Sequence, residues 1–296
     1  QLNFVPRQYL STSPVRDNVT NSFLTANLTN PFYPLLPNTN LSAKTVQRQQ
    51  LLNPFPQFID IRATTNEGYS WYHSLQSRFD KRFGASYLLT ASWTWSKFME
   101  ATGFLNETDP VPARSISDQD RPHRFVGSAI YELPLGRRKR WAARWTGAPG
   151  TLVSGWQVQG IYRWQAGAPL GFGNALFYGD IKDIPLARGE RSIKRWFNTD
   201  GFEKTSNRQL VYNIRAFPLR LAGVRAAPVN MWDLSMSKNT RLRERATAQF
   251  RAEFINALNH AHFANPNVSP SNTAFGTIAS TNQMPRTIQF GLRLTY

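Results

Sequence analysis

The chain has 296 residues and a formal net charge of +17, from 35 Lys and Arg residues against 18 Asp and Glu residues. It contains no cysteine, which excludes a disulfide framework and thiolate metal sites. No stretch approaches the roughly 18 consecutive apolar residues of a membrane-spanning helix, in line with a mean hydropathy of −0.44. Barrel strands remain compatible with these values, because they are apolar only at every second residue.

The excess of positive charge raises the local concentration of anions such as phosphate, carboxylates, nucleic acid or lipid head groups. Basic residues with interleaved aromatic residues also suit single-stranded nucleic acid, which is one alternative for this chain. However, the charge is spread over many segments, and no nucleic-acid-binding motif is present. We therefore do not expect nucleic acid to be the partner.

Residues 1–66 are rich in Asn, Thr, Ser and Pro and show almost no sustained periodicity. The prolines of 30–38 and 51–58 each remove a backbone donor, which disfavours helices and central strands there. We predict a long loop region over 1–66, ending in a short strand at 57–62. The remainder, 67–296, is predicted to hold the strands.

From residue 67 onward, apolar and polar side chains alternate with a period of two in seven segments, which is typical of half-buried strands. In the last of them one face carries Ile288, Phe290, Leu292, Leu294 and Tyr296. The seven predicted strands are 72–82, 86–97, 123–134, 155–167, 230–239, 246–258 and 287–296. Aromatic residues lie near both ends of several apolar rows, as the two aromatic girdles of a membrane barrel require.

The connections between these strands alternate in length. One set, at 84–85, 135–154 and 240–245, is the shorter. The other set, near 98–122, 168–228 and 259–284, is long, and loops of this length are rare in compact soluble domains. If the long set is extracellular, the C-terminus is periplasmic, as in bacterial outer-membrane barrels. The RRKR run at 137–140 is either a solvated connection, which we favour, or a patch for nucleic acid or lipid.

The alternation predicts one face without charge and one face rich in Gln, Ser and Arg. A soluble β-sandwich would alternate too, but with shorter loops, so we expect hydrocarbon on one side and a wet or plugged lumen on the other. Candidates for contact with a solute or a plug are Gln157, Gln159, Arg163, Gln165, Arg251, Glu253 and Arg293. Seven strands cannot close a barrel, since open edges leave backbone groups unpaired in hydrocarbon. We expect the remaining strands to come from a longer receptor or from another chain.

The end of the chain, PRTIQFGLRLTY, carries a further pattern. It resembles the C-terminal assembly signal of bacterial outer-membrane barrels, in which a polar residue, a glycine, an apolar residue and a final aromatic residue recur at fixed spacing. The matching positions are Gln289, Gly291, Leu294 and Tyr296. The resemblance implies that the barrel-assembly machinery reads this strand.

An ordered series of segments also resembles a known family. The segments are FPQF at 55–58, YHSLQSRFDKRF, LLTASWTWSK, DxDRPHRFVGSAIYELPLG, SGWQVQGIYRWQAGAPL, NMWDLSMSKNTRL, AQFRAEFINALNHAHF and PRTIQFGLRLTY. Together they resemble the C-terminal barrel of Oar-like TonB-dependent receptors of the Acidobacteria type, in the carboxypeptidase-regulatory-like domain family. The resemblance implies a 22-stranded barrel with a plug and a TonB box. The chain itself shows neither, so gating and coupling to the TonB complex would lie on other segments.

The sequence lacks the common motifs that carry catalysis. We find no Gly-x-Ser-x-Gly, P-loop, His-Glu-x-x-His or Rossmann pattern, and we expect no enzyme, catalytic residue, cofactor or metal. Two histidines separated by one residue on a strand place both rings on one face, where they could hold a metal. For His260 and His262 we favour the other interpretation, that they belong to a polar loop entry just past a strand.

The leading hypothesis is an all-β, antiparallel transmembrane barrel of the bacterial outer membrane. It would import a large or scarce solute through TonB, and the net charge of the chain predicts that this solute is anionic. The second is a non-transporting adhesive or structural surface protein whose basic loops bind anionic polymers. The third is a soluble secreted β-protein.

Overall fold

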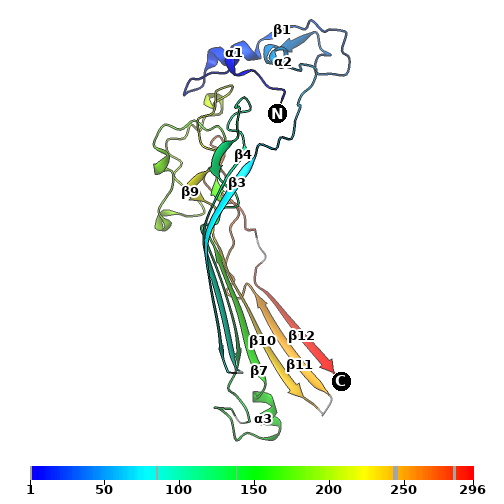
Figure 1. Cartoon of the computed structure of the whole chain (residues 1–296), viewed down its shortest axis with the longest axis vertical. Coiled ribbons are helices and arrows are strands. Elements are labelled where there is room, and N and C mark those ends of the chain that lie inside the picture. The colour runs from blue at the N-terminus through cyan, green and yellow to red at the C-terminus, as the bar shows by residue number, and fades with distance from the viewer. Residues whose placement is uncertain (1, 85, 138, 243–245, 283–284) are drawn as a thin grey trace.

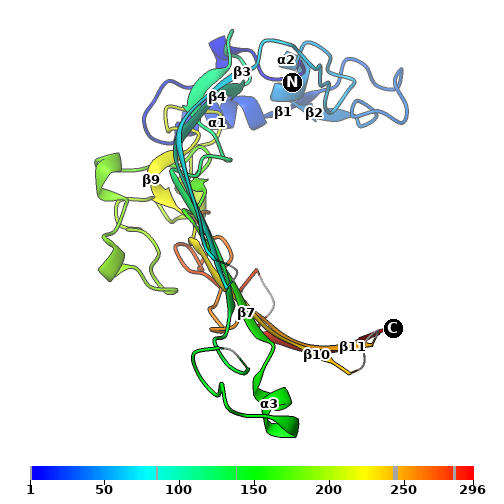
Figure 2. The same cartoon turned by 60° about the horizontal axis from the view of Figure 1, so that its bottom comes forward.

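The computed structural model describes residues 2–84, 86–137, 139–242, 246–282 and 285–296. They form one long, curved antiparallel sheet with folded segments at both of its ends (Figures 1 and 2). No helix among these residues is long and apolar enough to cross a membrane. Parts of the predicted connections 84–85, 137–140, 240–245 and 259–284 lie outside the described residues.

Seven long strands make up the sheet, and their order in space follows their order in the chain. All seven coincide with strands predicted from the alternation, and the largest difference is the continuation of one strand to Gly103. They are β3 (Tyr69–Phe83), β4 (Tyr87–Gly103), β6 (His123–Glu132), β7 (Trp156–Gln165), β10 (Val229–Arg241), β11 (Thr247–Ile255) and β12 (Thr287–Thr295). A short strand, β5 (Ala113–Ile116), pairs with the part of β4 that extends beyond β6.

The registers between neighbouring strands bring the apolar rows together on one face. Each strand alternates, and every pairing sets an apolar position opposite another apolar position through most of the sheet. One row in register across six strands is Leu89, Ala129, Gly160, Leu234, Phe254 and Ile288. The sheet therefore has one mainly apolar face and one mainly polar face, as the sequence predicted, although the polar face also carries Leu88, Ile130 and Ile161.

The prediction that the apolar face carries no charge is wrong at its ends. The registers put Lys81 opposite Leu89 and Lys238 opposite Trp156. Lys97 shares the same face near the long connections, where it pairs with His73. These cations stand at the ends of the apolar rows because lysine can keep its stem on apolar surface and its amine in water.

Both edges of the sheet are open. Within the described residues, β3 pairs only with β4 and β12 pairs only with β11. This matches the expectation that the seven strands do not close on themselves. Because edges exposed to hydrocarbon leave backbone groups unpaired, a closed barrel needs further strands beyond β3 and β12.

The N-terminal region is not the unbroken loop that the sequence predicted. It contains the helices α1 (Asn18–Thr25) and α2 (Arg48–Leu52), the short 3-10 helix η1 (Arg7–Tyr9), and a ribbon of β1 (Asn27–Thr29) with β2 (Thr45–Gln47). The strand predicted at 57–62 is absent from these described residues, and turns and extended chain take its place. The prolines do stop α2, since it ends at Leu52 just before Asn53-Pro54.

The N-terminal region lies at the end of the sheet from which the long connections leave (Figure 1). Arg7 forms a 2.8 Å ion pair with Asp109 of the connection between β4 and β6. The Tyr212 hydroxyl donates to the Gln49 side chain over 2.7 Å, and the Asn213 amide donates to the Val15 carbonyl over 2.9 Å. These contacts thus pack the N-terminal region against the long connections at this end of the sheet.

We define the loop cap as residues 168–228 together with 259–282. Its first part holds β8 (Pro169–Leu170) paired with β9 (Leu221–Arg225) and the 3-10 helices η2 (Ile181–Asp183), η3 (Arg188–Glu190) and η4 (Ser206–Arg208). Phe172 packs at its centre, with ring centroids 5.0 Å from Phe197 and 5.1 Å from Phe202. The buried cluster comprises Leu170, Phe172, Ala175, Ile184, Phe197, Phe202, Phe217, Leu221, Val224, Ala226 and Phe275. The loop cap therefore has a hydrophobic core of its own.

At the opposite end of the sheet lie the shorter connections. The one between β6 and β7 is not a plain turn, because it contains the helix α3 (Gly147–Val153) (Figure 1). The chain reverses tightly after β3, where Gly84 has a φ of 59° that L-residues rarely adopt. We call this end the turn end and the other the loop end.

Candidate lumen site

The seven residues predicted to face a lumen all lie on the polar face. On β7 they occupy alternate positions, and the registers carry the same face to β10, β11 and β12. Glu253, for example, stands opposite both Ser235 and Gln289, while Arg293 stands opposite Gln249. The remaining predicted residues are Gln157, Gln159, Arg163, Gln165 and Arg251, and the structure places each on this face.

Ion pairs within the polar face fix its charged side chains. Arg163 and Asp233 are 2.6 Å apart across β7 and β10, and Asp233 also accepts the backbone N–H of Asn256 over 3.0 Å. Arg251 pairs with Glu253 at 2.6 Å on the same strand. The Gln289 amide donates to Glu253 from β12. Sequence reasoning identified both arginines but missed Asp233, which the alternation of β10 placed on the polar face.

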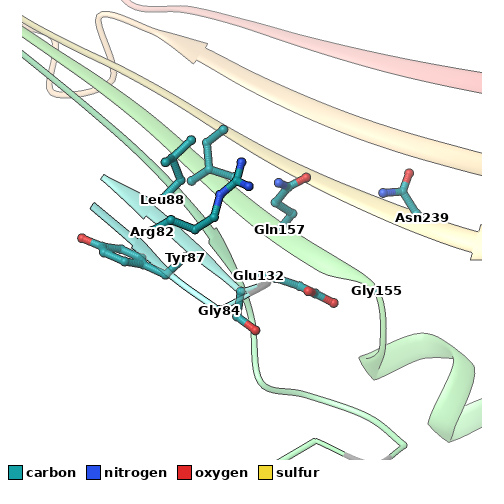
Figure 3. A pocket seen from close by; sticks show the side chains of 10 residues that line it. Arg82, Gly84, Tyr87, Leu88, Glu132, Gly155, Gln157 and Asn239 are labelled. Carbon is teal, nitrogen blue, oxygen red and sulfur yellow. The ribbon is translucent and has the colours of Figure 1, made fainter. Parts of the chain in front are cut away.

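Six of the seven predicted residues, all but Arg293, line three hollows along the polar face. Gln159, Arg163, Arg251 and Glu253 line one of about 360 Å³ in mid-sheet. A larger one of about 560 Å³ lies near the turn end and includes Gln157 with Arg82, Glu132 and Asn239 among its lining residues (Figure 3). Gln165 lines a third, of about 240 Å³, beside His262 at the foot of the loop cap. The face thus offers polar, charged surface along its length rather than one deep pocket.

A buried carboxylate ties the connection before β6 to the loop cap. Asp120 is only 1% exposed; it accepts the Phe98 backbone N–H over 2.7 Å and forms a 2.7 Å ion pair with Arg225. Arg220 reaches Glu100, on the polar face of β4, over 2.8 Å. Sequence reasoning proposed none of these four charged residues, although Asp120 lies in the DxDRPHRF segment that was quoted for its resemblance.

Further hydrogen bonds at the loop end act together with these ion pairs to set the position of the loop cap. Ser96, also on the polar face of β4, donates its hydroxyl to the Arg121 carbonyl over 2.9 Å. Arg225 donates to the Gly167 carbonyl over 3.1 Å, at the point where the chain leaves β7. The loop cap is therefore anchored on the polar side of the sheet at the loop end.

Burial shifts the pKa of two basic groups near this anchor. It lowers the pKa of Arg121, with the positive Arg225 acting in the same direction, although arginine stays protonated. It also lowers the pKa of His262 below its usual 6.5, helped by His260 and Arg163. His262 is thus neutral at pH 7, and its Nε2 atom is buried without a hydrogen-bond partner in the structure.

His260 and His262, considered as a metal pair, have ring centroids 5.9 Å apart with nearly perpendicular planes. Within the described part of the chain, no group of three or more His, Cys, Asp or Glu side chains is placed to hold a metal ion. The two rings therefore supply at most two ligands, too few for a closed protein site.

Comparison with protein families identifies the family to which the chain belongs. The family model described as "Outer membrane beta barrel domain" matches residues 15–289, which is most of the chain. The chain belongs to this outer membrane beta barrel domain family. Comparisons with curated proteins and with solved structures gave no match.

Membership of the outer membrane beta barrel domain family explains the two faces. Strands of such barrels direct apolar side chains to lipid and polar side chains to the interior. The apolar face, with its exposed Trp, Phe and Leu rows, is the lipid-facing one, and the face with the ion pairs is the lumen-facing one. A soluble β-sandwich is excluded, and the outer membrane is where such a domain works.

Proposed function

We propose that this domain is the C-terminal part of a TonB-dependent outer-membrane receptor that takes up a large or scarce solute of the siderophore, oligosaccharide or peptide class. The observation that carries the proposal is the anchoring of the loop cap to the polar face of β4 through Arg220–Glu100 and to the connection before β6 through Arg225–Asp120. A folded cap held at the loop end of a polar face suits the capture of a solute that must then pass inward. The similarity to Oar-like receptors supports the same proposal.

In this proposal the long connections are extracellular and the C-terminus is periplasmic. The plug and the TonB box lie on segments other than those described, and they engage the TonB complex. Arg163, Arg251 and Glu253 contact either the plug or the passing solute. Gln289, Gly291, Leu294 and Tyr296 form the signal for the barrel-assembly machinery, and the fully exposed Tyr296 is accessible to it. A 22-stranded barrel would supply the strands that flank β3 and β12.

The transport proposal is tested with the full-length gene in its host. Uptake of a panel of labelled siderophores, oligosaccharides and peptides is compared in the wild type, a deletion strain, and a strain lacking TonB. We expect one class to lose uptake in both mutant strains and to regain it when the gene is restored. Unchanged uptake of every class in the deletion strain would contradict transport.

The orientation is tested separately by single-cysteine labelling, because the chain has no cysteine of its own. Ser206 of the loop cap and Thr146 at the turn end are both exposed to solvent. On intact cells, a membrane-impermeant maleimide is expected to label Ser206→Cys and not Thr146→Cys. The reverse pattern would overturn the orientation.

A non-transporting adhesive role is the second candidate, because the surface of the loop cap carries several exposed cations. They are Lys182, Arg188, Lys194, Arg195, Lys204 and Arg208. Such cations bind anionic polymers through charge, so adhesion would weaken as ionic strength rises. Loss of salt-sensitive cell binding to an anionic polymer in the deletion strain, with all solute uptake retained, would favour this role.

A further inference from the structure

The connection between β6 and β7 carries an unusual concentration of positive charge and tryptophan. From 133 to 155 it contains five Lys and Arg residues, two Trp and no acidic residue. Arg137, Arg140 and Arg144 are exposed, and Trp141 and Trp145 are each about half exposed. We call Arg137, Lys139, Arg140, Trp141, Arg144 and Trp145 the turn-end patch. Apart from the ion pair of Lys139 with Glu132 of the polar face, neither the polar face nor the loop cap uses it.

The turn-end patch is a folded feature rather than a loose tether. The Trp141 backbone N–H donates to the Pro134 carbonyl over 3.0 Å, and the Gly136 N–H donates back to Trp141 over 3.0 Å. The Arg140 guanidinium lies 5.7 Å from the Trp141 ring, within cation–π range. Lys139 is held by Glu132 at 3.1 Å, which leaves the three arginines as the exposed cations of the patch.

An aromatic row on the lipid-facing side of the sheet ends beside this connection. The rings of Phe83 and Tyr87 are 5.4 Å apart, and those of Tyr87 and Tyr131 are 5.9 Å apart. Trp156 continues the row on β7, with the Lys238 amine 5.4 Å from its ring. Aromatic rings and snorkelling lysines gather at the level of the lipid head groups. The turn end therefore lies at a membrane–water interface.

Contacts with α3 join the connection to this aromatic row. The Trp156 indole donates to the Leu152 carbonyl over 2.9 Å, and the Lys238 amine donates to the Thr151 and Ser154 carbonyls over 2.6 and 2.7 Å. Leu152 itself is 68% exposed, an apolar side chain directed away from the protein at the same end. The connection is thus held next to the head-group layer, with arginine, tryptophan and leucine side chains available to it.

We propose that the turn-end patch binds the phosphate groups of anionic phospholipids in the leaflet that it borders. Arginine presents a planar fork that matches phosphate oxygens, and tryptophan prefers the head-group layer. A run of cations beside a membrane gains from the negative potential of anionic lipids. With the orientation proposed above, this is the periplasmic leaflet, but the inference requires only that the barrel spans a membrane. It is independent of transport.

The test uses the full-length protein in non-ionic detergent, stripped of lipid and titrated with phosphatidylglycerol or phosphatidylcholine, with bound lipids counted by native mass spectrometry. The patch variant is R137Q/R140Q/R144Q. The matched control is K44Q/R62Q/R114Q, which removes three exposed cations from the loop end. We expect the patch variant to bind phosphatidylglycerol roughly fivefold more weakly per arginine removed, and the control to bind like the wild type.

Two results would overturn the proposal: equal weakening by the patch variant and its control, or equal affinity of the wild type for the two lipids. A third arm adds W141A/W145A, for which weaker retention of phosphatidylglycerol is expected. Soluble glycerol phosphate and a short oligonucleotide complete the set, and binding of either as tightly as phosphatidylglycerol would show a general anion site rather than a lipid surface. Should the triple variant not fold, the single variants Arg140→Gln and Arg144→Gln are measured in the same way.

Discussion

The sheet and the loop cap use the same residue types in opposite ways. On β12, Phe290 is 71% exposed and Leu294 is 63% exposed, whereas in the loop cap Phe197 is completely buried. The apolar side chains of the sheet form a surface, and those of the loop cap form a core. The arrangement on the sheet would be costly in water and is favourable in hydrocarbon, while the loop cap is built like a small soluble domain.

The comparison shows where each region gets its stability. In the sheet, backbone pairing and the alternation of apolar and polar side chains are sufficient for stability. Lipid accepts any apolar side chain that lies within the apolar band of the barrel. In the loop cap, a specific cluster of rings and a buried ion pair must be assembled from distant segments. Substitutions should therefore act differently in the two regions.

The largest effect is expected from Phe197→Ala in the loop cap. Removing a fully buried ring next to Phe172 and Phe275 leaves a cavity, which costs about 3–5 kcal/mol of stability. Hydrogen exchange followed by mass spectrometry should show lost protection across the loop cap and unchanged protection in β6 and β7. Phe290→Ala serves as the control and should leave the loop cap protected. If it loosens the loop cap as much as Phe197→Ala does, the two regions are not separate.

Asp120→Ala is expected to have a comparable or slightly smaller effect on the same region. It leaves Arg225 without its carboxylate partner in a partly buried site, and breaking a buried pair in this way costs about 3–5 kcal/mol. Limited proteolysis should cleave the connections near 98–122 and 168–228 faster in this variant. Asp200→Ala, which breaks the exposed pair with Arg195, is the control and should leave cleavage unchanged. Equal cleavage of the two variants would contradict the anchoring role of Asp120.

A charge on the lipid-facing side of the sheet should act through the membrane rather than through packing. Ala91 and Thr90 are neighbours on β4 that point to opposite faces, and Ala91 lies midway between Tyr87 and Trp95 on the lipid-facing side. Ala91→Arg is expected to destabilise folding into lipid bilayers by about 2–4 kcal/mol, as for arginine near the bilayer midplane, and Thr90→Arg much less. Urea titration of refolding into vesicles measures both. Equal losses would show that the two faces share one environment.

The smallest effect concerns acid and the N-terminal region. Hydrogen bonds from the Thr20 backbone and side chain, with a further one from Ser11, lower the pKa of Asp17 to about 2. A carboxylate with a lowered folded-state pKa stabilises the fold above its unfolded pKa, so its contribution is lost as pH falls from about 4 to 2. Protection of α1 against hydrogen exchange should fall over that range in the wild type. Asp17→Asn should lack this pH dependence, and an identical profile in both would contradict the assignment.

The strands were predictable because their signal is local. A period of two needs only neighbouring residues, so all seven strands and the shared face of the seven candidate residues followed from the sequence. Lysines at the row ends were missed because alternation alone does not mark the height at which the membrane ends. The registers between strands were not predicted, since they depend on side-chain pairs between segments far apart in the chain.

The loop end was less predictable because its order comes from contacts between distant segments. Phe275 joins a core formed mainly by residues 170–226, and Asp120 meets Arg225 across more than a hundred residues. Nothing near Phe275 or Asp120 in the sequence indicates these partners. Helix α1 did carry a local signal, an aspartate at its N-cap, which the abundance of Asn, Thr and Pro around it obscured.

The central claim is that the alternation on these strands separates hydrocarbon from water, and spin-label accessibility along β7 tests it most directly. Nitroxides are placed singly at Gly160, Tyr162, Gln157 and Gln159 of the full-length protein in lipid bilayers, and collisions with oxygen and with a water-soluble nickel complex are measured. We expect labels at Gly160 and Tyr162 to favour oxygen, and those at Gln157 and Gln159 to favour nickel or be shielded from both by a plug. Labels at Gly160 and Tyr162 that exclude oxygen, as they would under a second layer of protein, would contradict the account.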